Sequence, residues 1–316
     1  MSADLHQRVA AAILQQLETA DPSTWSPPWH GADPLPRNAL TGKRYRGLNI
    51  LALWAAAQAR GYADPRWATY RQWAALGAQV RRGERGTSVI FYKDLPTSPA
   101  LAKGIPGTDD ASPRFVARAA HVFNAAQVDG AQDLALPPPS ETVDPPIVFT
   151  AFVRATGAII RENGTRACYV PKIDTILLPP RSAFHSPEGY AATFAHELVH
   201  WTGARHRLAR DLTGRFGSQA YAAEELVAEL GAAFVLADLG VARAPHPDHA
   251  AYCAAWASLL RSEPRALATT ASEASRAVDY LAALQVGRTT RDALSRDTDP
   301  LDQSTDSAGR FIQAAA

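Results

Sequence analysis

The stretch AHELVHWTGARH, residues 195–206, decides how the second half of the chain is interpreted. It holds two histidines four positions apart, His196 and His200, with Glu197 directly after the first. On an α-helix such histidines share a face, about 5–6 Å apart at Cβ, so both imidazoles can bind one metal ion. The glutamate one step round the helix can take a proton from a metal-bound water. We expect one zinc ion per chain, with His196 and His200 as ligands and Glu197 as catalytic base.

The residues around this motif predict a helix with clear ends. Ser186 can cap its N-terminus, Pro187 suits its first turn, and Glu188 complements its dipole. Gly203 is a typical helix stop. The motif therefore lies inside a capped helix, and this context favours a metal site over two histidines that are merely buried.

The third metal ligand has two candidates. The longer pattern HExxHxxGxxH ends at His206 and resembles the metzincins, which also need a methionine turn beneath the metal. Because the only methionine is Met1, that turn cannot be supplied, and His206 stays an alternative ligand. Glu225 and Glu229 are again four apart, on a helix predicted over 221–240, and their spacing resembles the glutamate zincins. That resemblance implies Glu225 as ligand and Glu229 as the partner that orients an imidazole, with the two roles exchangeable.

Other polar residues near the motif are candidates for roles beside the metal ligands. Tyr221, His206 and Arg207 are candidates for stabilising the oxyanion of a tetrahedral intermediate. Glu224 lies about 100° round the helix from Glu225, so we expect it at the surface.

Composition indicates a soluble globular protein. Of 316 residues, 47% are apolar and 20% are charged. The sequence contains no run of 18 apolar residues, so no membrane span is predicted. The two cysteines, Cys168 and Cys253, are far apart in sequence. So few cysteines favour a reducing compartment, hence the cytoplasm, and argue against a cysteine-based zinc site.

The N-terminal half alternates cations with aromatic rings. Residues 37–93 contain eleven Lys or Arg against two acids, Asp64 and Glu84. Single-stranded nucleic acid is commonly bound by such surfaces, with cations along the phosphates and rings stacked on bases at roughly 1–3 kcal/mol per base. The residues that this pattern selects for DNA binding are Tyr45, Arg46, Trp67, Tyr70, Arg81 and Arg82. Trp54 and Trp73, flanked by Ala and Leu, are expected in the core instead.

We expect an α+β protein with two domains. A small α/β domain over 1–130 has a helix predicted at 47–61, a turn followed by a second helix within 63–78, and strands at 87–92 and 114–128. The segment 131–146 is rich in proline and acids and is predicted to be a linker. A mainly helical domain with a small sheet follows over 147–290, and 291–316 is predicted to be a disordered tail.

Taken together, these segments resemble the ArdC-type antirestriction proteins. The resemblance rests on HELVHWTG, RLAR and YAAEELVAELGAAF in the second half, and on PWHG, RNALTGKRYRGLN, DPRWATYRQWAALGAQVRRGERGTSVIFY and VFNAAQV in the first. It implies a single-stranded-DNA-binding domain joined to a zincin-like metallopeptidase domain. Such proteins are encoded on plasmids and related mobile DNA and protect incoming DNA from restriction during conjugation. The resemblance also implies DNA contacts across Asn38–Asn49 and Trp67–Arg85, which add Asn38, Lys43, Arg44, Asn49, Arg71 and Arg85.

Two functions fit these features. The first is an antirestriction protein that binds single-stranded DNA non-specifically and cleaves a DNA-associated protein, such as a restriction-system component, as a zinc endopeptidase of the gluzincin type. The second is a protective single-stranded-DNA-binding protein whose metal is structural. Because structural zinc sites have four protein ligands and catalytic sites keep an open position, a fourth ligand would favour the second function.

Overall fold

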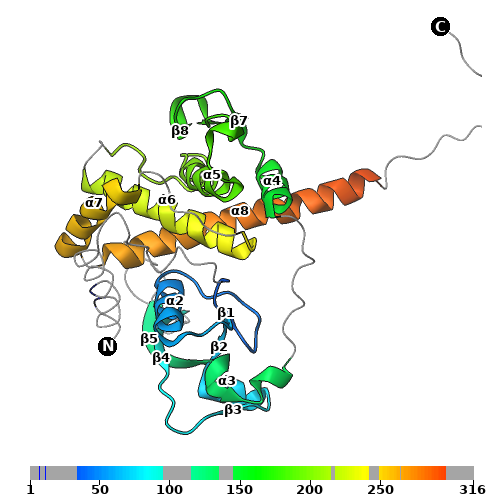
Figure 1. Cartoon of the computed structure of the whole chain (residues 1–316), viewed down its shortest axis with the longest axis vertical. Coiled ribbons are helices and arrows are strands. Elements are labelled where there is room, and N and C mark those ends of the chain that lie inside the picture. The colour runs from blue at the N-terminus through cyan, green and yellow to red at the C-terminus, as the bar shows by residue number, and fades with distance from the viewer. Residues whose placement is uncertain are drawn as a thin grey trace, which may run out of the picture.

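The computed structural model of the chain describes residues 34–94, 115–134, 145–214, 218–241, 249–263 and 265–296, together with positions 7 and 11. An N-terminal α/β part precedes a larger, mainly helical part with its own small sheet, so the predicted α+β class is confirmed (Figure 1). Most of the predicted N-terminal helix, linker and tail lies outside the described residues. Residues 291–296, predicted to be disordered, instead form the end of a long helix.

The N-terminal part is built on a four-stranded sheet in the order β1-β2-β5-β4. Its strands are β1 (Arg37–Asn38), β2 (Arg66–Ala68), β4 (Thr87–Asp94) and β5 (Phe115–Asn124). β1 runs parallel to β2, and the other neighbours are antiparallel. The remaining elements are helices α2 (Leu48–Arg60) and α3 (Tyr70–Ala75), the pair of strands β3 (Gln79–Val80) and β6 (Val128–Asp129), and the 3-10 turns η2 (Ala125–Gln127) and η3 (Ala131–Asp133).

Local sequence explains where these helices begin and end. Gly47 precedes α2 with a φ of 55°, a conformation that favours glycine, and Gly61 ends the helix in the left-handed region. Thr69 and Gln72 form a reciprocal capping box at the start of α3. Segment 63–78 is predicted to be a turn followed by a helix. The helix is confirmed as α3, but the residues before it also form the buried strand β2 between β1 and β5, which was not predicted.

The C-terminal part combines helices with a three-stranded sheet in the order β7-β9-β8, which packs against α5. Its helices are α4 (Pro145–Thr156), α5 (Pro187–Thr202), α6 (Gln219–Asp238), α7 (His249–Ser262) and α8 (Ala266–Arg296). Its strands are β7 (Ile159–Arg161), β8 (Cys168–Val170) and β9 (Thr175–Leu177), with the 3-10 turns η4 (Pro171–Ile173) and η5 (Arg181–Ala183). In Figure 1, α6 and α8 cross the middle of the molecule, with α5 and the sheet on one side and the N-terminal part on the other.

The Ser186 hydroxyl caps α5 by accepting from the Gly189 N–H at 3.0 Å, as predicted.

Helices α5 and α6 pack unusually closely. Gly231 on α6 faces Val199 on α5, and a Cβ at position 231 would lie 2.8 Å from both γ-methyl groups of Val199. The missing side chain at Gly231 therefore sets the short distance between the two helices that carry the histidine motif and the predicted acidic ligand.

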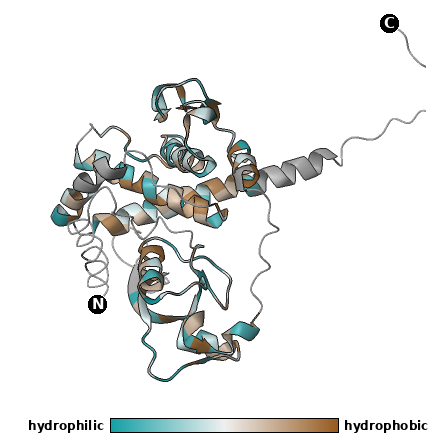
Figure 2. Ribbon diagram, in the orientation of Figure 1, coloured by the Kyte–Doolittle hydropathy of each residue, from teal (hydrophilic) through white to brown (hydrophobic). Residues whose placement is uncertain are grey.

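The two parts of the molecule share one hydrophobic core. Leu51 and Trp54 of α2 belong to the same buried cluster as Phe234 of α6 and Leu281 of α8. The Trp54 and Phe234 rings are 5.6 Å apart between centroids. Figure 2 shows hydrophobic residues on α2 and along the middle of α6 and α8. Trp73 fills a second, smaller core within the N-terminal part, so both tryptophans predicted to be structural are indeed buried.

None of the helices in the described part of the chain has the length and apolar character that a membrane crossing requires.

Candidate metal centre and nucleic-acid surface

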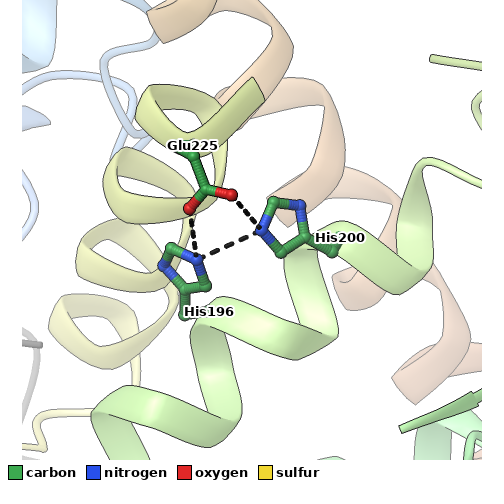
Figure 3. Close-up of side chains that lie close together, drawn as sticks. All are labelled: His196, His200 and Glu225. Carbon is green, nitrogen blue, oxygen red and sulfur yellow. Dashed lines mark hydrogen bonds and ion pairs between the residues drawn. The ribbon is translucent and has the colours of Figure 1, made fainter. Parts of the chain in front are cut away.

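Two neighbouring helices bring three predicted ligands together. His196 and His200 extend from α5, and Glu225 extends from α6 between them (Figure 3). The two Nε2 atoms are 3.1 Å apart, and the Glu225 carboxylate reaches both, at 3.2 Å from His196 and 3.7 Å from His200. These three are the one group among the described His, Cys, Asp and Glu residues whose ligand atoms all lie within 4.8 Å of one another.

The spacing of this group fits a single divalent cation. A tetrahedral zinc ion with bonds of roughly 2.0–2.1 Å holds two ligand atoms about 3.3 Å apart. The three inward-facing atoms match that separation, and imidazole nitrogen with carboxylate oxygen is a donor set typical of zinc and its neighbours in the first transition series. We conclude that the site is suited to one divalent metal ion held by three protein ligands.

A carboxylate lies near the Nδ1 atom of each imidazole, on the side away from the metal position, and orients the ring. Glu224 Oε1 lies 3.0 Å from Nδ1 of His200, and Glu229 Oε2 lies 3.7 Å from Nδ1 of His196. An Nδ1–H directed at a carboxylate leaves Nε2 unprotonated and aimed at the metal. Glu229 thus occupies the supporting position that the sequence implies. The expectation for Glu224 is wrong, because its side chain is only 12% exposed and contacts His200.

Arg210 holds Glu224 in place, and sequence reasoning missed this residue. Its guanidinium donates two hydrogen bonds to the Glu224 carboxylate, at 2.9 and 3.0 Å. It also donates to the Val199 carbonyl and the Thr202 hydroxyl near the C-terminal end of α5. A cation there donates to a carbonyl of the last helical turn and interacts favourably with the helix dipole. The only sequence signal was the RLAR segment after the motif, which carried no assigned role.

Electrostatics at the centre favour a bound cation. Burial lowers the pKa of both histidines, but hydrogen bonds outweigh it: Glu225 and Glu229 raise the pKa of His196 to about 10. Glu224 and Glu225 likewise raise the pKa of His200 to about 9. Burial raises the pKa of Glu225, yet its contacts with both histidines hold that pKa below its ordinary value. The carboxylates therefore favour positive charge at this site. Protons on the imidazoles can supply it, and a bound divalent ion supplies it when the imidazoles are neutral.

Glu197, the predicted base, lies beside the ligands at the edge of the small sheet. It is 6% exposed, and its Oε2 accepts a hydrogen bond from the Tyr169 backbone N–H in β8 at 2.8 Å. A cavity of about 280 Å³ opens over the cluster. Its walls include Glu197, Tyr221, Leu212, Cys168 and Tyr169, together with all three ligands. Tyr221 is thus the one oxyanion candidate that borders this cavity.

His206 and Arg207 lie away from the metal cluster. The His206 side chain is 64% exposed and lies 3.3 Å from Asp174, so the longer histidine pattern does not form a ligand set here. Arg207 is buried against Asp174 and the Tyr169 hydroxyl, and its guanidinium lies 3.8 Å from the Trp201 ring centroid. Both residues therefore fix the β8–β9 turn against the end of α5, and neither is available as an oxyanion donor.

The predicted DNA-binding residues divide into exposed and buried sets. The exposed ones are Lys43, Arg46, Tyr70, Arg71, Arg81, Arg82 and Arg85. Tyr45 is only 5% exposed and Trp67 only 1%, so the prediction that these rings stack on bases is wrong. Their rings belong to the main core, where the Tyr45 hydroxyl donates to the Trp67 carbonyl and Tyr62 meets the Trp67 ring edge-on.

Two predicted amide contacts serve the fold instead. Asn49 pairs with both backbone groups of Ile90, which ties α2 to β4. The side-chain oxygen Oδ1 of Asn38 accepts from the Leu40 and Thr41 N–H groups and so shapes the following turn. Both asparagines, which are predicted to contact DNA, thus use their side-chain amides for contacts within the protein.

Several predicted cations pair across the boundary between the two parts. Asp238, at the end of α6, accepts from Arg44 at 2.6 Å and from Arg37 at 3.1 Å. Arg46 pairs with Asp279 on α8. Arg44 and Arg46, in the segment Asn38–Asn49 that is predicted to contact DNA, are therefore held by α6 and α8, which also belong to the shared core.

Comparison with known proteins gives consistent matches to both halves. The family model for the N-terminal domain of the anti-restriction factor ArdC matches residues 3–123, and that for zincin-like metallopeptidases (MPTase-PolyVal) matches residues 148–273. Uncharacterized protein y4eC of Sinorhizobium fredii (strain NBRC 101917 / NGR234) is 43% identical over 288 residues, which are 89% of this chain and 92% of y4eC. DNA primase TraC of Escherichia coli is 40% identical over 296 residues, again 89% of this chain but 20% of the primase.

Solved structures give the same result. The metal-free crystal structure of the antirestriction protein ArdC from the R388 plasmid has a TM-score of 0.71 at 35% identity, and the match covers 90% of this chain and 98% of that one. Its Mn(II)-bound structure has a TM-score of 0.69 at 35% identity, with 88% and 97% covered.

Proposed function

Because the chain belongs to the ArdC family of antirestriction proteins, we propose that it binds single-stranded DNA without sequence preference and acts there as a zinc-dependent endopeptidase. Its substrate would be a DNA-associated protein in the cytoplasm, such as a component of a restriction system. The observation that carries this proposal is an open cavity in which three ligands, and no fourth among the described residues, converge beside Glu197.

The ligand count favours a catalytic site over a structural one. Catalytic zinc sites have three protein ligands and an open position, whereas structural sites are closed by four. The candidates for a fourth ligand are otherwise engaged, since Glu229 lies behind His196 and His206 pairs with Asp174. The cavity over the cluster leaves space for water and a substrate carbonyl.

Each side chain has a definite task in the proposed reaction. A bound zinc ion would supply Lewis acidity and lower the pKa of a coordinated water towards roughly 7. The Glu197 carboxylate, fixed by the Tyr169 N–H, would accept the proton of the attacking water and deliver it to the leaving amine. Tyr221, in the wall of the cavity, would donate to the developing oxyanion.

Exposed cations on the N-terminal part support single-stranded DNA as the partner. Lys43, Arg71, Arg82 and Arg85 are solvent-exposed, and among the described residues no ion pair forms with them. Such cations release counterions on binding phosphates, so affinity should fall steeply with salt and depend little on sequence.

The peptidase proposal is tested with Glu197→Gln. Purified wild-type protein, Glu197→Gln and Glu225→Gln are each incubated with single-stranded DNA and host extract, with or without a chelator, and cleaved proteins are identified by mass spectrometry. We expect chelator-sensitive cleavage by wild type alone. We expect Glu197→Gln to keep its metal, by elemental analysis, and Glu225→Gln to lose it. Equal DNA protection by wild type and Glu197→Gln would support the structural-metal alternative and reject catalysis.

A further inference from the structure

A second cavity lies away from the metal centre, between the two parts of the molecule. Its volume is about 600 Å³, within the roughly 300–1,000 Å³ typical of small-molecule sites. One wall comes from the N-terminal part and includes Lys43, Arg46, Gln72 and Phe91. The opposite wall comes from α8, through Ala268, Ser272 and Ser275. The two sequence blocks that build it are more than 170 positions apart, so no motif could reveal it.

Positive charge and hydrogen-bond donors dominate the polar side of this cavity. The residues that line it include Lys43, Arg44 and Arg46 and no Asp or Glu, and the partners of Arg44 and Arg46, Asp238 and Asp279, lie outside this lining. Lys43 is exposed, and no described residue accepts a hydrogen bond from its ammonium group. The Gln72 carbonyl oxygen already accepts from Asn38 and Thr69, whereas its amide nitrogen donates to no described residue. An anion with a hydrogen-bonding edge is therefore the complementary ligand.

An aromatic ring completes the site. Phe91, in the middle of the paired strand β4, is 42% exposed and lines the cavity. Exposed rings beside cations are the usual platform for unpaired bases. A base in a duplex is stacked and paired, so it could reach Phe91 only by flipping out.

We propose that this cavity binds one nucleotide unit of single-stranded DNA, with the phosphate at Lys43 and Arg46, the base on Phe91, and α8 of the metallopeptidase part as the facing wall. This inference deepens the proposed single-stranded-DNA binding and rests on it. It makes the DNA site composite, since Ser272 and Ser275 of α8 belong to it and the Ser275 hydroxyl accepts from the Gly47 N–H at 2.8 Å.

The test places a negative charge on the α8 wall. Ser272 is exposed and lines the cavity, so Ser272→Glu would repel a bound phosphate. Thr269→Glu is the matched control, because Thr269 is an exposed residue of the same helix that borders a different surface. Binding of the full-length, metal-loaded protein to a fluorescein-labelled oligo-dT is measured by fluorescence anisotropy. We expect about tenfold weaker binding for Ser272→Glu and wild-type affinity for Thr269→Glu.

A second variant keeps the test decisive if Ser272→Glu fails to fold. Phe91→Leu retains an apolar side chain but removes the ring, and we expect about tenfold weaker binding from lost stacking. Wild-type affinity for Phe91→Leu, or equal affinities for Ser272→Glu and Thr269→Glu, would overturn the cavity as the nucleotide site while leaving the proposed function intact. If wild type itself does not bind oligo-dT, the proposed function fails.

Discussion

The Tyr45 hydroxyl shows how one atom assigned to DNA binding instead supports the fold. It donates to the Trp67 carbonyl at 3.2 Å inside the N-terminal part. Burial raises the pKa of Tyr45 to about 12, partly opposed by a hydrogen bond from Asn38. In the folded state the phenol therefore keeps its proton to higher pH than in the unfolded chain. Stability from this group is complete below pH 10 and is lost as the pH rises towards 12.

We accordingly predict that Tyr45→Phe flattens the alkaline limb of the stability curve. At neutral pH the variant should lose about 0.5–1.5 kcal/mol, the usual net worth of one hydrogen bond. Between pH 10 and 12 that difference from wild type should shrink, because the variant has no phenol to ionise at this position. Urea unfolding at several pH values measures both effects. A constant difference across this range would show that Tyr45 does not titrate as described.

At the metal centre we predict that Glu224→Gln weakens metal affinity without removing a ligand. Glu224 orients His200 through Nδ1 and is itself held by Arg210. Loss of such a carboxylate typically costs 10–100-fold in metal affinity, roughly what we expect here. Calorimetric titration with Mn²⁺ measures it, and Glu263→Gln, at an exposed glutamate outside the site, is the matched control. If the Mn²⁺ affinity of Glu224→Gln equals that of wild type, Glu224 is not needed to orient His200.

At the scale of secondary-structure elements, the close packing of α5 on α6 determines whether Glu225 can reach both histidines. We predict that Gly231→Ala destabilises the protein, because the new methyl group would overlap Val199. Overpacking of this kind costs about 1–3 kcal/mol, offset by about 0.5–1 kcal/mol from better helix propensity.

The double variant Gly231→Ala/Val199→Ala separates overlap from other causes. If crowding is responsible, removal of the Val199 methyl groups should restore part of the stability lost in Gly231→Ala, and a double-mutant cycle by urea unfolding measures this coupling. Strict additivity of the two substitutions would contradict the close approach. Metal affinity should fall with Gly231→Ala and recover in parallel.

Local signals in the sequence predicted some elements and missed others for identifiable reasons. The helix from Ser186 carries its own cap and its histidine spacing, so it and its inward-facing ligands could be predicted. β2 and β7 are three residues each, too short for a periodic pattern, and β2 is a strand only because β1 and β5 flank it. The role of Glu224 depends on how α6 crosses α5, which helical periodicity does not contain.

Burial was the second limit on sequence reasoning. A ring beside a cation gives the same pattern whether the ring faces a base or the core. Tyr45 and Trp67 proved to be core residues, whereas Tyr70 is exposed. The distinction arises only when α2, the sheet and the helices of the second part assemble around them. The interdomain cavity is unpredictable for the same reason, since α8 supplies half of it.

At the scale of the whole molecule, the shared core predicts that metal binding stabilises the N-terminal part as well. A ligand that binds only the folded state raises the free energy of unfolding of every element that unfolds with its site. Trp54 packs on Phe234, and Asp238 forms ion pairs with Arg37 and Arg44. We therefore expect α2 to unfold together with α6. We predict that Mn²⁺ slows amide hydrogen exchange in Leu48–Arg60 as well as in α5 and α6. Slowing confined to the second part would show that the halves open independently.

The packing of Trp54 against Phe234 also bears on how such a gene can be rearranged. If the chain were divided at the proline-rich segment, each fragment would expose the hydrophobic surface that the other fragment covers. Each fragment would then tend to aggregate when produced alone. One half could be exchanged between relatives only if the residues that it packs against on the other half were exchanged as well. The alignment to the much longer TraC protein spans both halves together, as expected for a unit inherited as a single block.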